Sequence, residues 1–179
     1  MKLFPLAFPA LALASLSPVA ASEKGWDTAS HVGVISLSAW SIGVPAVTGD
    51  GTGAWQAAAS TGVAYGMATV MKEAIPSTRP DLSDDRSFPS GHTSAAFGAA
   101  VSILERRGVR EGIPAIALAS FVGVARVQAR RHRWTDILAG AAVGTASGLL
   151  LTKPLASKRL VIAPWADSTG GGTTVRFAF

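Results

Sequence analysis

The stretch that decides the fold runs from Lys72 to Asp136 and contains KEAIPSTRP (residues 72–80), PSGH (residues 89–92) and ARVQARRHRWTD (residues 125–136). It holds ten of the sixteen lysine and arginine residues, whereas the segments between and around the three motifs are apolar and rich in small residues. Charges are costly to bury unless something pairs with them. Basic side chains gathered between apolar segments therefore indicate one shared anion, and phosphate fits best.

The second motif stands directly before TSAAFGAAVSIL (residues 93–104), which has the composition of a helix. Ser90 fits the N-cap of this helix, and Gly91 lets the backbone come close to a ligand. The exposed N–H groups of a first turn, together with the helix dipole, form a natural anion site. His92 would point into the same place.

The third motif places a carboxylate and an imidazole on one helix face, because His132 and Asp136 are four residues apart. A carboxylate within reach of an imidazole fixes its tautomer and makes it a better nucleophile or base. Arg126 offers a planar guanidinium for phosphate oxygens. In the first motif, Lys72 ends an apolar segment, and Arg79 follows after a loop.

In this order, KxxxxxxRP, PSGH and RxxxxxHxxxD resemble the three signature motifs of the type-2 phosphatidic acid phosphatase superfamily. That superfamily includes membrane lipid phosphatases, class A bacterial acid phosphatases and vanadium-dependent haloperoxidases. The resemblance covers residues 28–152 and leaves out both ends of the chain.

The resemblance implies a role for each motif residue. His132 would be the nucleophile that forms a phosphohistidine, Asp136 would orient it, and His92 would protonate the leaving oxygen and later activate water. The implied phosphate-binding residues are Lys72, Arg79, Ser90, Gly91 and Arg126. Neither a metal nor another cofactor is implied, because fixed cations stabilise the charge. Ala125 stands where family members usually carry serine, so weaker phosphate binding is expected.

The composition indicates one domain in or near a membrane. The chain has 179 residues, 49% hydrophobic and 15% charged, against about 25% charged in ordinary globular domains. The net charge of +5 could indicate nucleic acid, but the basic residues interrupt apolar helices without interleaved aromatics, so no nucleic-acid partner is expected. The absence of cysteine excludes disulfides and thiolate chemistry.

The chain divides into a leader, a helical domain and a tail. Residues 1–21 resemble a secretory signal peptide, with an uncleaved first membrane helix as the alternative. Residues 22–153 are predicted to form an all-α bundle of five to six mostly apolar helices. Residues 154–179 contain two apolar runs around a glycine-rich turn, which predicts a short C-terminal β-hairpin.

If the helices alternate across a membrane, all three motifs lie on one side, and the basic loop with Arg106, Arg107 and Arg110 lies on the other. Positive loops stay in the cytoplasm, which places the site on the periplasmic side of the inner membrane. The alternative is a soluble periplasmic bundle, which would need polar outward faces.

The predicted function is therefore a phosphatase acting on a phosphomonoester or diphosphate, with a lipid-linked substrate favoured. Undecaprenyl pyrophosphate, phosphatidylglycerol phosphate and phosphorylated lipid A are the candidates. The alternatives are a soluble acid phosphatase of broad specificity and a vanadate-dependent haloperoxidase. The acidic loop at residues 81–86 is either a polar turn or a gate over the site, and His31, which has no motif around it, is assigned a structural role.

Overall fold

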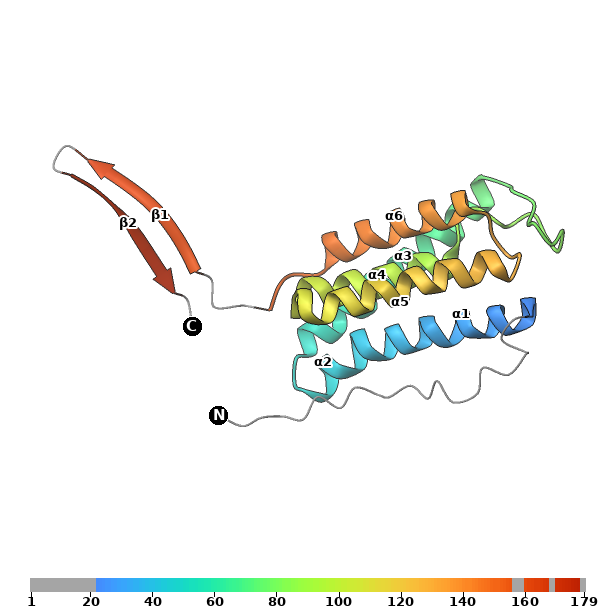
Figure 1. Cartoon of the computed structure of the whole chain (residues 1–179), viewed down its shortest axis with the longest axis horizontal. Coiled ribbons are helices and arrows are strands. Elements are labelled where there is room, and N and C mark those ends of the chain that lie inside the picture. Colours follow the sequence, from blue (N-terminus) through green and yellow to red (C-terminus); the bar gives the residue numbers. More distant parts are fainter. Residues whose placement is uncertain (1–21, 156–159, 168–169, 178–179) are drawn as a thin grey trace.

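Five long helical segments packed side by side make up most of the computed structural model, which describes residues 22–155, 160–167 and 170–177 (Figure 1). In chain order the elements are α1 Glu23–Ser38, a π-helical turn Ala39–Gly43, α2 Val44–Val47, α3 Gly51–Ala74, α4 Gly91–Arg107, α5 Val109–Gln128, α6 Trp134–Leu151, β1 Leu160–Asp167 and β2 Gly170–Phe177. The first three follow one another without a break, so they count as one segment. The predicted all-α bundle is confirmed. The predicted signal peptide, residues 1–21, lies outside the described residues.

Short polar side chains start the helices that matter for the site. The Asp50 carboxylate accepts the Gly53 N–H at 2.9 Å at the start of α3. Ser90 Oγ accepts the Thr93 N–H at 3.3 Å at the start of α4, which confirms its predicted N-cap role. Gly108, at a φ of 84°, ends α4, because a left-handed conformation favours glycine.

α4 is the central helix and packs against α1, α3, α5 and α6. Its contact with α6 is close because α6 presents glycines: a Cβ on Gly140 would lie 2.6 Å from the Ser90 carbonyl oxygen, and one on Gly144 would lie 2.3 Å from that of Ser94. The Ser90 N–H also donates to the Asp136 carbonyl at 3.0 Å. The start of α6 is thereby fixed beside the start of α4.

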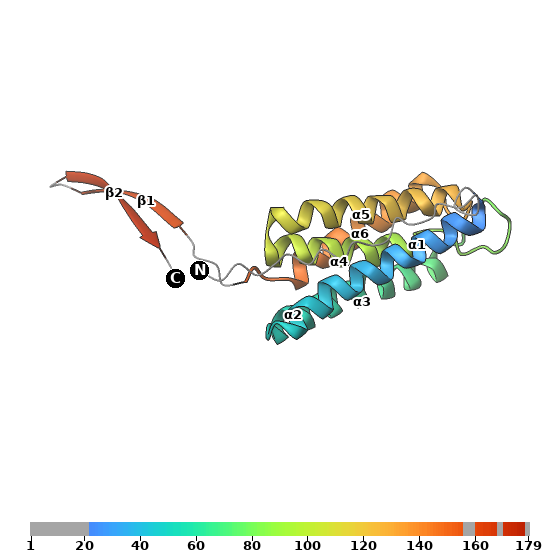
Figure 2. The same cartoon turned by 60° about the horizontal axis from the view of Figure 1, so that its bottom comes forward.

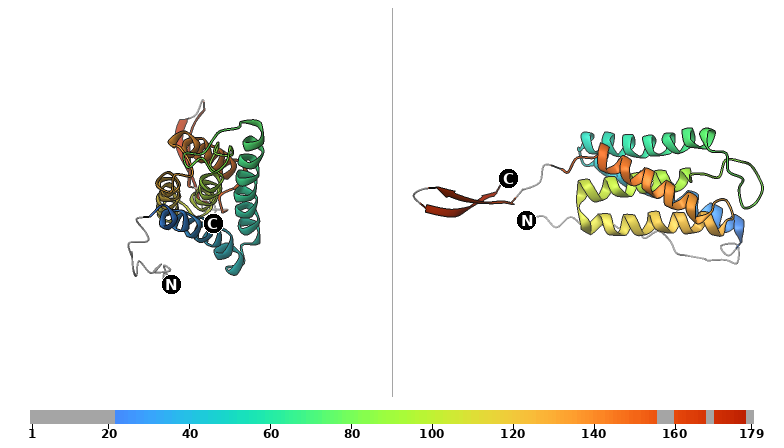
Figure 3. Two further views of the ribbon diagram at one scale, coloured as in Figure 1. Left: turned by 90° about the vertical axis from the view of Figure 1, so that its right-hand side faces the viewer. Right: turned by 90° about the horizontal axis from the view of Figure 1, so that it is seen from above.

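The three motifs meet at one end of the bundle, where α3 and α5 end and where α4 and α6 begin (Figures 1 and 3). The N-terminus of α1 lies at the same end. The opposite end carries Arg106, which bonds the Asp50 carboxylate at 2.8 Å and the Lys153 carbonyl at 3.0 Å. The predicted separation of the motifs from the basic loop is confirmed.

The outward faces of the helices carry large apolar side chains. Ile35 is 67% exposed, Val70 64% and Leu138 69%. Within the described residues, two helical segments are long and apolar enough to cross a membrane, Glu23–Val47 and Trp134–Leu151. Residues 51–71 carry no charged side chain and lie in α3, which is long enough but does not reach that hydropathy.

The tail forms the two-stranded antiparallel pair that the sequence predicted, with Leu160 opposite Phe177 and Asp167 opposite Gly170. Among the described residues, no helix contacts either strand, and both lie apart from the bundle in Figures 1 and 2. The described residues of the two strands therefore make no contact with the site at the far end of the bundle.

Candidate active site

His132 and Asp136 form the buried centre of the site. His132 lies in the connection between α5 and α6, and Asp136 lies in the first turn of α6. Both side chains are 2% exposed, and Nδ1 of His132 is 3.6 Å from Oδ2 of Asp136. This separation is longer than a hydrogen bond, and Nδ1 has no hydrogen-bond partner among the described residues.

The Asp136 carboxylate is itself held firmly. Its Oδ2 accepts the Ser87 hydroxyl at 2.5 Å and the Arg133 N–H at 2.8 Å. The second bond caps the start of α6. Ser87 is completely buried and comes from the loop between α3 and α4. Sequence reasoning missed Ser87, because no local pattern connects it to a carboxylate 49 residues away.

Three cations act on the His132 ring. Burial lowers the pKa of His132 most, and the positive charges of Arg126, Lys72 and Arg79 lower it further. Asp136 opposes them and raises it. The three cations that the sequence singled out therefore lie close enough to the His132 ring for their charges to lower its pKa.

Arg126 reaches the site from α5 and is 4% exposed. Its guanidinium donates to the Asp27 carboxylate and, at 3.2 Å, to the Ser30 hydroxyl, both on α1. Its Nε has no partner among the described residues. A buried donor without an acceptor costs about 1–3 kcal/mol, so an anion that accepted this N–H would bind favourably.

The other two cations are engaged by the loop between α3 and α4. Arg79 Nε donates to the Asp84 carboxylate at 2.6 Å. Lys72 Nζ donates to the carbonyls of Arg86, Ser87 and Pro89, at 2.7, 3.1 and 2.6 Å. All three ammonium N–H groups are then committed to the loop, so the predicted binding of phosphate by Lys72 stays a prediction.

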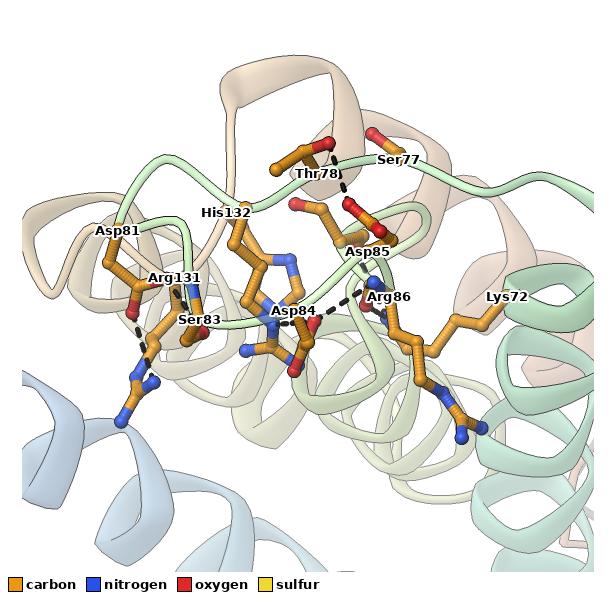
Figure 4. Close-up of polar contacts among 12 residues, drawn as sticks. Lys72, Ser77, Thr78, Asp81, Ser83, Asp84, Asp85, Arg86, Arg131 and His132 are labelled. Carbon is orange, nitrogen blue, oxygen red and sulfur yellow. Dashed lines mark hydrogen bonds and ion pairs between the residues drawn. The ribbon is translucent and has the colours of Figure 1, made fainter.

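The acidic residues of this loop also pair with arginines of the site. The Arg131 guanidinium donates to the Asp81 carboxylate at 3.0 Å (Figure 4). The pKa of Asp84 is lowered: burial would raise it, but the hydrogen bonds from the Arg86 N–H and from Arg79 outweigh that effect. The pKa of Asp81 is lowered as well, so both carboxylates are ionised at neutral pH.

The second motif packs more tightly than its predicted role requires. Ser90 is completely buried, and its Oγ also accepts the Thr93 hydroxyl at 2.9 Å. A Cβ on Gly91 would lie 3.1 Å from the ring of Tyr65 on α3. These contacts explain both residues by packing, and their predicted contact with phosphate stays a prediction. Ala125 is completely buried as well. Because its side chain is a methyl group, it offers no hydroxyl to a ligand.

His92, the second residue of α4, is half-buried and lies against His31 of α1, with the ring centroids 4.4 Å apart and the planes at 77°. His31, to which the sequence assigned a structural role, therefore contacts a motif residue, and Asp27 was missed. A signal was present: Asp27 and His31 are four residues apart, as are His132 and Asp136.

A cavity of about 500 Å³ opens beside these groups. It is lined by Glu23, Lys24, Asp27, Asp81, Ala129 and Arg131. Two of these lining residues also connect the cavity to Arg126, because Asp27 pairs with both Arg126 and Arg131. A polar headgroup could occupy this space next to the site.

Comparison with known proteins identifies the family. Residues 53–158, more than half of the chain, match the PAP2 superfamily. The chain belongs to the PAP2 superfamily. This is the type-2 phosphatidic acid phosphatase superfamily, so the resemblance of the three motifs is confirmed. The PAP2 match begins inside α3 and therefore includes the motifs but not Asp27 or His31.

Two curated relatives and one solved structure are similar to this PAP2 chain. It is 38% identical over 88 residues to the lipid A 1-phosphatase of Porphyromonas gingivalis, a match that covers 48% of this chain and 20% of the relative. It is 31% identical over 96 residues to the lipid A 4'-phosphatase of Helicobacter pylori, covering 54% of this chain and 48% of the relative. The chain thus spans half or less of either relative.

The crystal structure of Aquifex aeolicus LpxE has the same fold, with a TM-score of 0.60 over 72% of this chain and 83% of that one. The sequence identity is 18%, so this likeness concerns the fold. It independently supports the helical arrangement that places the PAP2 motifs at one end of the bundle.

Proposed function

We propose that this protein is a metal-independent phosphatase that hydrolyses a lipid-linked phosphomonoester or diphosphate through a phosphohistidine at His132. One observation carries the proposal: a buried imidazole faces a fixed carboxylate at 3.6 Å while the charges of Arg126, Lys72 and Arg79 act on the same ring. Such a site attracts a tetrahedral oxyanion and keeps the imidazole unprotonated for attack.

The chemistry follows from the positions of the ring nitrogens. With Nδ1–H directed at Asp136, the lone pair of His132 is on Nε2, which attacks phosphorus. The P–O bond to the leaving group breaks, its electron pair stays on oxygen, and that oxygen takes a proton from His92. Burial and the charge of Arg126 lower the pKa of His92 to about 3, and the negative charge of a bound phosphoryl group raises it so that the ring carries this proton. Water then attacks the phosphohistidine, His92 accepts the proton, the N–P bond breaks and inorganic phosphate leaves.

Arg126 is the arginine best placed to hold the phosphoryl group. Its Nε–H is buried and lacks an acceptor, and a phosphoryl oxygen would supply one. Arg79 would join it once a substrate oxygen replaces the Asp84 carboxylate. Fixed guanidinium groups stabilise the charge that develops on the transferring group, so activity is expected to persist in EDTA.

The apolar exterior supports a lipid-linked substrate and a membrane location. Ile35, Val70 and Leu138 are more than 60% exposed on three different helices, and exposed apolar surface of this extent marks a membrane or partner contact. A soluble bundle would need polar side chains there. The relatives named for lipid A phosphatase activity favour a phosphorylated glycolipid among the candidate substrates.

The test is a substrate panel on the purified full-length chain in detergent. Phosphate release would be measured from lipid A, undecaprenyl pyrophosphate, phosphatidylglycerol phosphate and p-nitrophenyl phosphate, and an acid-labile phosphoenzyme would be trapped with radiolabelled substrate. His132→Ala should abolish both signals. Arg130→Ala, at a side chain 61% exposed, is the matched control and should keep them. Release that survives in His132→Ala, or no release from the whole panel, would refute the proposal.

A further inference from the structure

The ring of His92 has only one ring partner among the described residues, which is His31. The two rings meet edge to face, with centroids 4.4 Å apart and planes at 77°. Histidine rings in this arrangement attract each other, as other aromatic pairs do. The contact joins α1 to the start of α4, across 61 residues of sequence.

His92 lacks the kind of support that His132 has. His132 faces the Asp136 carboxylate, which two further hydrogen bonds hold in place. The His92 side chain makes no hydrogen bond to any residue in the described part of the chain. A group that transfers protons must be held in one orientation. For His92 the ring of His31 is the contact that can do this.

His31 is itself fixed. Its Nδ1 lies 2.8 Å from the Asp27 carbonyl, one turn earlier in α1. A carbonyl only accepts, so this nitrogen carries the proton. The Asp27 carboxylate, in turn, holds Arg126. One turn of α1 therefore supports two site groups, the phosphate-binding arginine through Asp27 and the proton donor through His31.

We propose that His31 is a positioning residue for His92, holding its ring in the orientation that protonates the leaving group. The inference rests on the proposed function. It extends that function by assigning a role to α1, which lies outside the three motifs. The consequence depends on the leaving group, because an alkoxide or sugar oxygen needs a proton as the P–O bond breaks and p-nitrophenolate does not.

The experiment compares two substrates on the full-length chain in detergent: a primary alkyl phosphate and p-nitrophenyl phosphate. The kcat/KM reports phosphoryl transfer to His132 for both. General acid catalysis contributes about 10²–10⁴-fold, so His31→Ala should lower kcat/KM for the alkyl phosphate by about tenfold or more and leave that for p-nitrophenyl phosphate within about threefold. His31→Phe keeps a ring and should recover most of the loss.

Thr28→Ala is the matched control, an exposed residue on the same helix whose hydroxyl bonds only the Lys24 carbonyl within the described residues. It should leave both substrates unchanged. Equal losses of kcat/KM for the two substrates in His31→Ala, or no recovery in His31→Phe, would overturn the positioning role. If the wild-type chain hydrolyses neither substrate nor any lipid phosphate, the proposed function fails instead, and the two failures are distinguishable.

Discussion

At the residue scale, the site depends on two histidines held by different means. The His132–Asp136 pair is local, because the two residues are four apart in sequence, and the carboxylate is fixed by Ser87 at 2.5 Å. His92 depends on a ring from another helix. The proposed nucleophile therefore has its carboxylate four residues along the chain, whereas the proposed proton donor contacts a ring from another helix.

Replacing Asp136 tests the local pair. Asp136→Asn keeps an oxygen for Ser87 and Arg133 but loses the negative charge that orients Nδ1–H and stabilises the charged ring. We expect folding to persist and kcat to fall by about 10²–10⁴-fold, the range of a lost proton-transfer or orienting group. Phosphate release and far-UV circular dichroism on the same samples are the measurements. A near-normal kcat would contradict the orienting role.

The pKa of His132 gives a pH prediction. Burial and three cations lower it, so the ring stays neutral and nucleophilic to a more acidic pH than free imidazole, and the acid limb of kcat/KM should lie below about pH 6.5. Arg79→Gln removes one of the charges that lower this pKa, so the acid limb should move to higher pH. A kcat/KM profile whose acid limb keeps its position in Arg79→Gln would be the contrary result.

At the element scale, the loop between α3 and α4 is fastened to the site by charged groups. Lys72 Nζ donates to three of its carbonyls, and Arg133 donates to the Thr78 carbonyl at 2.7 Å. Asp81 and Asp84 pair with arginines, as Figure 4 shows for Asp81. These contacts hold the acidic loop in place at the end of the bundle where the motifs meet.

Replacing Asp84 tests this loop, because its carboxylate accepts a hydrogen bond from the Arg79 guanidinium. Asp84→Asn should strengthen inhibition by inorganic phosphate or vanadate, since the anion no longer competes with a carboxylate. The carboxylate is 42% exposed, and such pairs contribute about 0.2–1 kcal/mol, so the inhibition constant should fall by at most about fivefold. Asp85→Asn is the control, because Asp85 bonds Thr78 and no arginine. Equal effects in both variants would remove Asp84 from this role.

The elements also show how far sequence reasoning could reach. The three motifs could be found because each is a local sequence pattern at a helix end. His132 and Asp136 could be paired because they are only four residues apart. Ser87 and Asp27 were missed, and the contact of His31 with His92 was not foreseen, because these residues meet Asp136, Arg126 and His92 across 49, 99 and 61 residues of sequence. Such pairs depend on how α1 and the loop between α3 and α4 pack against the other helices. No periodicity in the sequence predicts this packing. Only the four-residue spacing of Asp27 and His31 hinted at it.

At the scale of the whole molecule, one end of the bundle carries the site and the other carries Arg106, Arg107 and Arg110. The apolar composition predicted the helices, and the glycines of α6 explain how closely they pack. α3 is rich in alanine, glycine, serine and threonine and has a lower hydropathy than the two helical segments that are apolar enough to cross a membrane. Because the motifs and the basic loop lie at opposite ends of the bundle, the structure predicts how the bundle would be oriented in a membrane.

The chain contains no cysteine, so single cysteines can report that orientation without background. Ser83→Cys lies in the loop over the site and Arg110→Cys at the opposite end, and both positions are exposed. Because basic loops stay in the cytoplasm, a membrane-impermeant maleimide added to spheroplasts should label Ser83→Cys at once and Arg110→Cys only after lysis. The inverse pattern would place the site in the cytoplasm. Labelling of both before lysis, with the protein released by osmotic shock, would instead show a soluble periplasmic bundle, whose exposed Ile35, Val70 and Leu138 would then need a protein partner to cover them.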